Sequence, residues 1–173
     1  FDLNIEAELQ TGRLERLPVG ELQLNTLGAL KASDGPGLVD YQVTSAPAAE
    51  RDAPPAELDL ALPRREQATL QRLVVELQLI GAPPSVVAAR VRAFLLGQFR
   101  YSLDLPAPAT GLTALETFLL QARAGHCEYF ASAAVLLLRA AGVPARYATG
   151  LSVAEYSPLE RAYVARRRHA HAW

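Results

Sequence analysis

The order of element types along the 173-residue chain predicts an α+β fold, with strands first, then helices, then strands again. Three observations support this prediction. Residues 1–10 alternate apolar and polar side chains, residues 70–141 contain segments with helical spacing, and residues 146–153 and 162–173 are expected to be extended. Half of the residues are apolar, which is ordinary for a globular protein with a buried core.

The first 45 residues are expected to form a small antiparallel β region. Phe1–Gln10 alternates without a miss, which is the period of a strand with one buried face. Residues 22–24 and 39–43 repeat this alternation, and Gly35-Pro36-Gly37 supplies a turn signal between them. The segment therefore predicts three strands.

A proline-rich connector is expected to follow this β region. Residues 46–63 contain four prolines, which disfavour helix and favour extended backbone. We therefore divide the chain into an N-terminal β region with its connector, residues 1–63, and a core of residues 64–173.

The core is expected to contain four helices. A second helix runs from about Ser85 to Gln98, and the Thr-x-x-Glu spacing of a capping box at Thr113–Glu116 begins a third. The fourth and most apolar helix runs from Cys127 to about Ala141, and Gly142-Val143-Pro144 ends it. The first helix is marked by apolar residues at positions i, i+3, i+4 and i+7, namely Leu70, Leu73, Val74 and Leu77.

Cys127 is the only cysteine in the chain, and it lies where a loop becomes this apolar helix. A helix N-terminus stabilises negative charge, and its unpaired first amide can hold an oxyanion. Gly125 would let the loop pass close to a substrate. The alternative is a small buried core residue, since free cysteine is among the most buried residue types. The polar neighbours His126 and Glu128 favour a position between loop and core.

His169 and His171 offer a base for the thiol near the end of the sequence. Being two residues apart, they would share one face of a strand. The alternative for this pair is a solvated strand face. Trp173 fits either a core position or the wall of a substrate groove.

Charge and hydropathy exclude other classes of protein. Lys and Arg number 17 against 18 Asp and Glu, so no overall field recruits nucleic acid or an anionic membrane. No stretch approaches the roughly 20 apolar residues that a transmembrane helix needs. The sequence begins without Met and starts and stops within patterns, so we expect a piece of a longer protein.

A zinc site is a further alternative. His126, Cys127, His169 and His171 are all residue types that bind zinc, although adjacent His126 and Cys127 converge poorly on one ion. No acidic loop has calcium-ligand spacing. We therefore expect no metal and no cofactor.

Four segments together resemble the transglutaminase-like superfamily: Gly125–Ala131, Leu138–Arg146, Thr149–Gly150 and Ala170–Trp173. The pattern is most similar to a bacterial branch in which such a domain lies outside the cytoplasmic membrane, attached to a membrane-spanning protein. The resemblance covers roughly residues 39–173. It implies a papain-like core, in which a cysteine at a helix N-terminus packs on an antiparallel sheet that carries histidine and then aspartate.

The resemblance also implies a mechanism. Cys127 matches the nucleophile and His171 the base, with the third member, an Asp, expected on a strand after Trp173. The implied reaction is attack on a glutamine carboxamide or a peptide bond through a thioester, followed by acyl transfer or hydrolysis. The implied substrate is a protein or peptide, the implied location is periplasmic, and the membrane tether would come from segments outside this chain.

Two further residues are weaker site predictions. Gln121, six residues before Cys127, could donate to the oxyanion or simply lie on the helix surface. Tyr101 could line the substrate groove or belong to the core. Because the expected Asp is not in the sequence, a non-catalytic transglutaminase-like domain that binds or scaffolds is the main alternative function.

Overall fold

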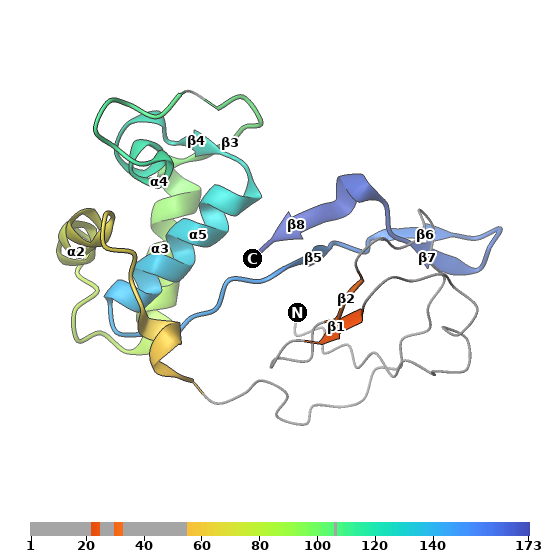
Figure 1. Cartoon of the computed structure of the whole chain (residues 1–173), viewed down its shortest axis with the longest axis horizontal. Helices are drawn as coiled ribbons and strands as arrows, with labels where there is room; N and C mark the ends of the chain where they lie inside the picture. The colour runs from red at the N-terminus through yellow and green to blue at the C-terminus, as the bar shows by residue number, and fades with distance from the viewer. Residues whose placement is uncertain (1–21, 25–29, 33–54, 106) are drawn as a thin grey trace. The chain divides into compact units, whose positions relative to one another are not determined.

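The computed structural model (Figure 1) forms two units, Phe1–Pro54 and Pro55–Trp173. In the first unit, strand β1 (Leu22–Leu24) pairs antiparallel with β2 (Leu30–Ala32). A strand is therefore present at residues 22–24 as predicted, whereas the strands predicted at 1–10 and 39–43 lie outside the described residues. The structure describes residues 22–24, 30–32, 55–105 and 107–173.

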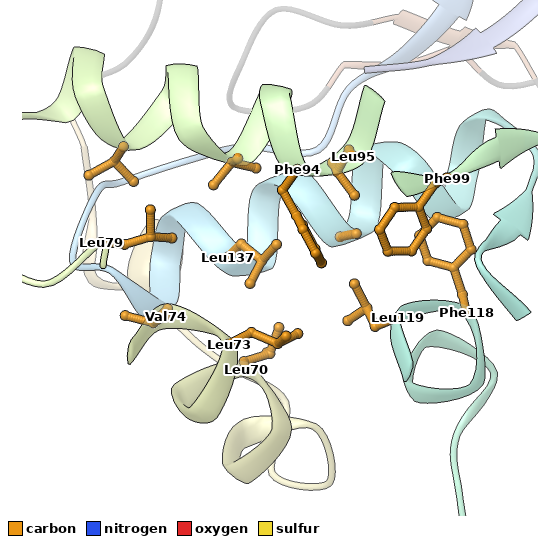
Figure 2. Close-up of a cluster of buried hydrophobic side chains, with 13 residues drawn as sticks. Leu70, Leu73, Val74, Leu79, Phe94, Leu95, Phe99, Phe118, Leu119 and Leu137 are labelled. Carbon is orange, nitrogen blue, oxygen red and sulfur yellow. The ribbon is translucent and has the colours of Figure 1, made fainter. Parts of the chain in front are cut away.

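Helix α5 (Cys127–Ala140) contacts both α2 (Gln67–Glu76) and α3 (Pro84–Gln98), and the space between these helices is the core of the second unit. Figure 2 shows apolar side chains from all three helices converging there. In the described part of the chain, no helix combines the length and the apolar character needed to cross a membrane. The largest fully buried side chains are Phe118, Leu70, Leu79, Leu119, Leu137 and Val87.

The four predicted helices are present, and the second and fourth begin and end within one residue of their expected bounds. The third, α4 (Ala114–Thr117), begins with the predicted capping box: Thr113 N–H donates to Glu116 Oε2 over 2.9 Å, and Glu116 N–H donates to Thr113 Oγ1 over 3.2 Å. Glu116 also accepts a 2.7 Å hydrogen bond from the Thr69 hydroxyl, which ties α4 to α2. A π-helical turn, η2 (Phe118–Ala122), continues α4 and was not predicted.

The predicted extended connector at residues 46–63 is wrong over part of its length. Glu57–Leu60 forms a 3-10 helix, η1, which contacts α5. Its Asp59 is 6% exposed and pairs with Arg146, 87 residues further along the chain. A contact between residues so far apart cannot be recognised from the local sequence. The prediction of extended backbone therefore rested on the prolines alone.

Short strands complete the second unit. Parallel strands β3 (Arg100–Tyr101) and β4 (Ala124–Gly125) pair just before α5. The described antiparallel pairs that follow α5 are β5 (Thr149–Leu151) with β8 (Ala170–Ala172), and β6 (Glu155–Ser157) with β7 (Ala162–Val164). Helices and antiparallel strands in one unit confirm the α+β class.

The single strand predicted at residues 162–173 is wrong, because a 3-10 turn, η3 (Arg167–His169), separates β7 from β8. Arg166 binds both carboxylate oxygens of Glu155, over 2.7 to 3.1 Å. The Arg166 N–H also donates to His169 Nδ1 over 3.1 Å, which closes the turn. These side-chain bonds interrupt the extended backbone.

Glu116→Gln tests the link between α2 and α4. Hydrogen bonds from Thr113 N–H and then from the Thr69 hydroxyl hold the pKa of Glu116 below its ordinary 4.5. A lowered folded-state pKa contributes stability above pH 4.5 that is lost as the pH falls through the lower value. We therefore expect the melting temperature of Glu116→Gln to be below that of the wild type at pH 7, with a difference that shrinks as the pH falls below 4.5.

The control is Glu76→Gln, at an exposed position at the end of α2, which should leave the melting temperature unchanged at every pH. A difference between Glu116→Gln and the wild type that stays constant with pH would show that the carboxylate charge is unimportant.

Candidate functional site

Cys127 is the first residue of α5, as the sequence predicts. His126 caps the helix, and its Nδ1 accepts a 3.4 Å hydrogen bond from the Glu128 N–H. The thiol is half-buried, so it lies at the boundary between loop and core. As the first helical residue, Cys127 has an amide without an intrahelical acceptor, and this amide points toward any anion bound at the helix end.

The loop before the thiol is fixed by β3. The Arg100 N–H donates to Arg123 O and the Ser102 N–H to Gly125 O, both over 2.9 Å. A Cβ at Gly125 would lie 3.0 Å from Phe118 Cδ2 and 3.0 Å from Tyr129 Cβ. Packing against these two side chains therefore requires glycine at position 125.

His171 lies at the centre of β8, opposite Gly150 of β5. Helix α5 contacts β8, so the helix that begins with the thiol lies beside the strand that carries this histidine (Figure 1). The imidazole is exposed and packs edge-to-face with Trp173, with ring centroids 5.1 Å apart. No hydrogen bond joins the Cys127 thiol to His171 within the described residues; catalytic hydrogen bonds are often long before substrate binds.

His169 does not share the strand face of His171, which corrects the expectation. It belongs to η3, where Nδ1 accepts from the Arg166 N–H and Nε2 lies 3.7 Å from Glu155 Oε2. The Arg166 hydrogen bonds lower the pKa of Glu155 to about 2, and the charges of Arg166 and Arg168 contribute further. Both nitrogens of His169 therefore face groups other than the thiol.

The weaker site predictions lie at the surface. Tyr101 is 60% exposed and stacks on Phe130, and Trp173 is 51% exposed, so the core interpretation is wrong for both. Gln121 is exposed on the π-helical turn η2. Trp173 contacts a predicted catalytic side chain, since its ring packs against that of His171.

Tyr147 was missed by the sequence reasoning. It lies between α5 and β5, two residues before the first residue of β5. Burial raises the pKa of its hydroxyl, and electrostatic interactions with Glu128 and Cys127 raise it further. Tyr147 is 41% exposed, and this electrostatic effect links its hydroxyl to the first turn of α5.

The zinc alternative gains no support from this geometry. Across the described ranges, no three His, Cys, Asp or Glu side chains gather where they could hold one ion. His169, one of the four residues considered as ligands, is engaged by Arg166 and Glu155.

Comparisons with known proteins give one family. Residues 73–173 match the model of the transglutaminase-like superfamily. A protein-glutamine gamma-glutamyltransferase of Pseudomonas aeruginosa is 35% identical over 138 residues, which are 77% of this chain but 20% of the relative. The uncharacterized protein YebA of Bacillus subtilis is 36% identical over 63 residues, 34% of this chain and 8% of its own.

Crystal structures of the periplasmic domain of TgpA from Pseudomonas aeruginosa are also similar. The ethylmercury-bound form matches with a TM-score of 0.57 and 34% identity, over 66% of this chain and 41% of that chain. A second structure of that domain gives a TM-score of 0.56. The present chain thus spans about a fifth of its transferase relative and two fifths of the TgpA periplasmic domain.

Gly125→Ala tests the packing that fixes the loop before Cys127. The added methyl group would collide with Phe118, which is 2% exposed and cannot move freely. Overpacking of this kind costs about 1–3 kcal/mol of unfolding free energy. We also expect slower labelling of Cys127 by iodoacetamide, because the residues before the thiol must shift.

Gly97→Ala is the matched control, since among the described residues nothing lies within 4 Å of a Cβ there and Gly97 is inside α3. That change should stabilise the protein by about 0.5–1 kcal/mol. Denaturant unfolding and labelling rates measure both effects; equal behaviour of the two variants would refute the packing argument.

Proposed function

Because this chain belongs to the transglutaminase-like superfamily, we propose that it is a cysteine-dependent enzyme that acts on the side-chain carboxamide of glutamine. The observation that carries the proposal is the position of Cys127 at the start of α5, on a helix that contacts the strand of His171. In this proposal Cys127 is the nucleophile and His171 is the base.

The proposed reaction has two stages. His171 takes the thiol proton, the Cys127 sulfur attacks the carboxamide carbon, and the C–N bond breaks as His171 returns the proton to the departing ammonia. A lysine amine or a water molecule then attacks the thioester, which releases a crosslinked or hydrolysed product and restores the thiol. An acidic partner for His171 remains a prediction, placed by resemblance on a strand after Trp173.

Two groups are candidates to stabilise the oxyanion of each stage. The Cys127 amide is available at the helix N-terminus. The Tyr147 hydroxyl, whose pKa Glu128 and Cys127 raise, is the second candidate; both Tyr147 and the alternative Gln121 are exposed.

The surroundings of the two histidines favour His171 as the base. The proton acceptor Nδ1 of His169 is already occupied by the Arg166 N–H, and Nε2 faces Glu155. The His171 ring is exposed, with Trp173 as its aromatic neighbour. A base must have a free nitrogen to accept a proton, so His171 is the better choice.

The relatives support the substrate class and the location. The Pseudomonas aeruginosa relative is a protein-glutamine gamma-glutamyltransferase, which favours protein or peptide glutamine as the acyl donor. The similar TgpA structures are of a periplasmic domain, which favours a periplasmic location for this chain. We propose further that segments outside this chain tether it to the membrane.

A binding or scaffolding domain without turnover is the second candidate function. The observation in its favour is that no hydrogen bond joins the Cys127 thiol to His171 in the described residues. The two candidates predict different behaviour of the thiol, which the experiments below separate.

Substitution of the proposed catalytic pair tests the enzyme directly. In the full-length protein, Cys127→Ala should abolish glutamine-dependent ammonia release, and His171→Ala should lower kcat by about 10³-fold or more. His169→Ala is the matched control and should retain kcat within about tenfold, because His169 faces Glu155. Retained activity in Cys127→Ala would rule out the proposed nucleophile.

Thiol reactivity separates the enzyme from the scaffold. An activated thiol should react with iodoacetamide at pH 6 faster than a free cysteine peptide, and His171→Ala should slow the reaction. A rate equal to that of the peptide, unchanged by His171→Ala, would favour the scaffold. The rate is measured by mass spectrometry of the alkylated protein.

A further inference from the structure

We infer that Asp59 is a positioning residue for the Cys127–His171 site, acting through Arg146 on the segment that joins α5 to β5. Asp59 lies before the residues that match the family model, which begin at 73. The inference rests on the function proposed above, and it adds to the site a residue that does not contact the substrate.

The contact between Asp59 and Arg146 fixes orientation as well as distance. Arg146 Nε donates to Asp59 Oδ1 over 3.0 Å, and Nη2 donates to Oδ2 over 2.8 Å. The Ala56 N–H donates to Oδ2 as well, over 2.9 Å, so the carboxylate is itself held in place. A two-point bond between a planar guanidinium and a carboxylate allows little rotation.

Backbone and side-chain bonds extend this contact into a clamp, here defined as residues 56–61 together with Arg139, Ala145 and Arg146. The Ala145 N–H donates to Asp59 O over 3.0 Å. Arg139, in the last turn of α5, donates from Nε to Ala145 O over 2.8 Å and from Nη1 to Ala61 O over 3.1 Å. The clamp therefore joins η1, the end of α5 and the start of the segment toward β5.

Two connections lead from the clamp to the site. Tyr147 follows Arg146 directly, and electrostatic interactions with Glu128 and Cys127 contribute to the raised pKa of its hydroxyl. Ala148 follows next and exchanges two backbone hydrogen bonds with Trp173, over 3.0 and 2.9 Å. A shift of Arg146 would thus be passed through Tyr147 and Ala148 to the strand pair that carries the base.

The chemical nature of this contact also indicates that it fixes the direction of the chain and does not only stabilise the fold. Asp59 is buried, and replacing a buried ion pair by apolar residues is often neutral or stabilising. Apolar side chains would not, however, fix the direction of the chain as a bidentate pair does. Small errors of geometry are costly in catalysis, since a misplacement of about 1 Å can lower the rate about a hundredfold.

The test uses Asp59→Asn and Arg146→Lys in the full-length protein. Asn keeps the size of Asp but loses its charge, and Lys keeps the charge of Arg but loses its two-point geometry. We expect kcat for a glutamine-containing peptide to fall about tenfold to a hundredfold in both variants, with KM changed by less than about twofold. In a double-mutant cycle the combined variant should lose little more than either single variant.

Hydrogen exchange supplies a readout that does not depend on activity. The amides of Ala148 and Trp173 should exchange faster in Asp59→Asn, because their mutual hydrogen bonds depend on the clamp. Glu116→Gln is the control: it also removes a buried carboxylate that accepts several hydrogen bonds, but in α4, and it should leave both amides and kcat per folded molecule unchanged.

The outcomes separate this inference from the proposed function. If the wild-type protein does not turn over glutamine peptides, the proposed function fails. If exchange at Ala148 and Trp173 is unchanged in Asp59→Asn, or if kcat falls only in proportion to the unfolded fraction, the clamp is merely structural and the inference is overturned.

Discussion

The burial of helix α5 on two sides is the constraint on which the rest of the second unit depends. Ala133 and Leu137 face the apolar core shared with α2 and α3. Ala131 and Val135 are also buried but lie outside that cluster, on another face of the helix. A helix that is enclosed on several faces can neither rotate nor slide without losing apolar contacts. The position of its first residue, Cys127, is therefore set by packing along its whole length.

This constraint explains which parts of the molecule were predictable. Helices α2, α3 and α5 were recognised because apolar spacing, capping residues and glycine or proline stops are local signals. The 3-10 helix η1 and the turn η3 were not, because they depend on ion pairs of Asp59 with Arg146 and of Glu155 with Arg166. The residues around each partner in the sequence do not indicate that such an ion pair forms.

The site divides in the same way. The neighbours of Cys127 and His171 form a sequence pattern, so both were proposed from the sequence, and the described contact of α5 with β8 is consistent with that pairing. Tyr147 was missed because its relation to Cys127 depends on how the chain returns after α5. The sequence also could not show that His169 and His171 belong to different elements. Two histidines with one residue between them would share a strand face, but η3 ends at His169 and β8 begins at Ala170.

The ion pair of Asp59 and Arg146 bears on where this transglutaminase-like unit begins. The family model starts at residue 73, yet Asp59 and the backbone around it bond to the segment that follows α5. A recombinant protein cut at residue 73, where the family model begins, would lose the carboxylate that Arg146 binds. The contacts that hold the segment after α5 therefore extend further toward the N-terminus than the family model, and a recombinant protein should begin before Ala56.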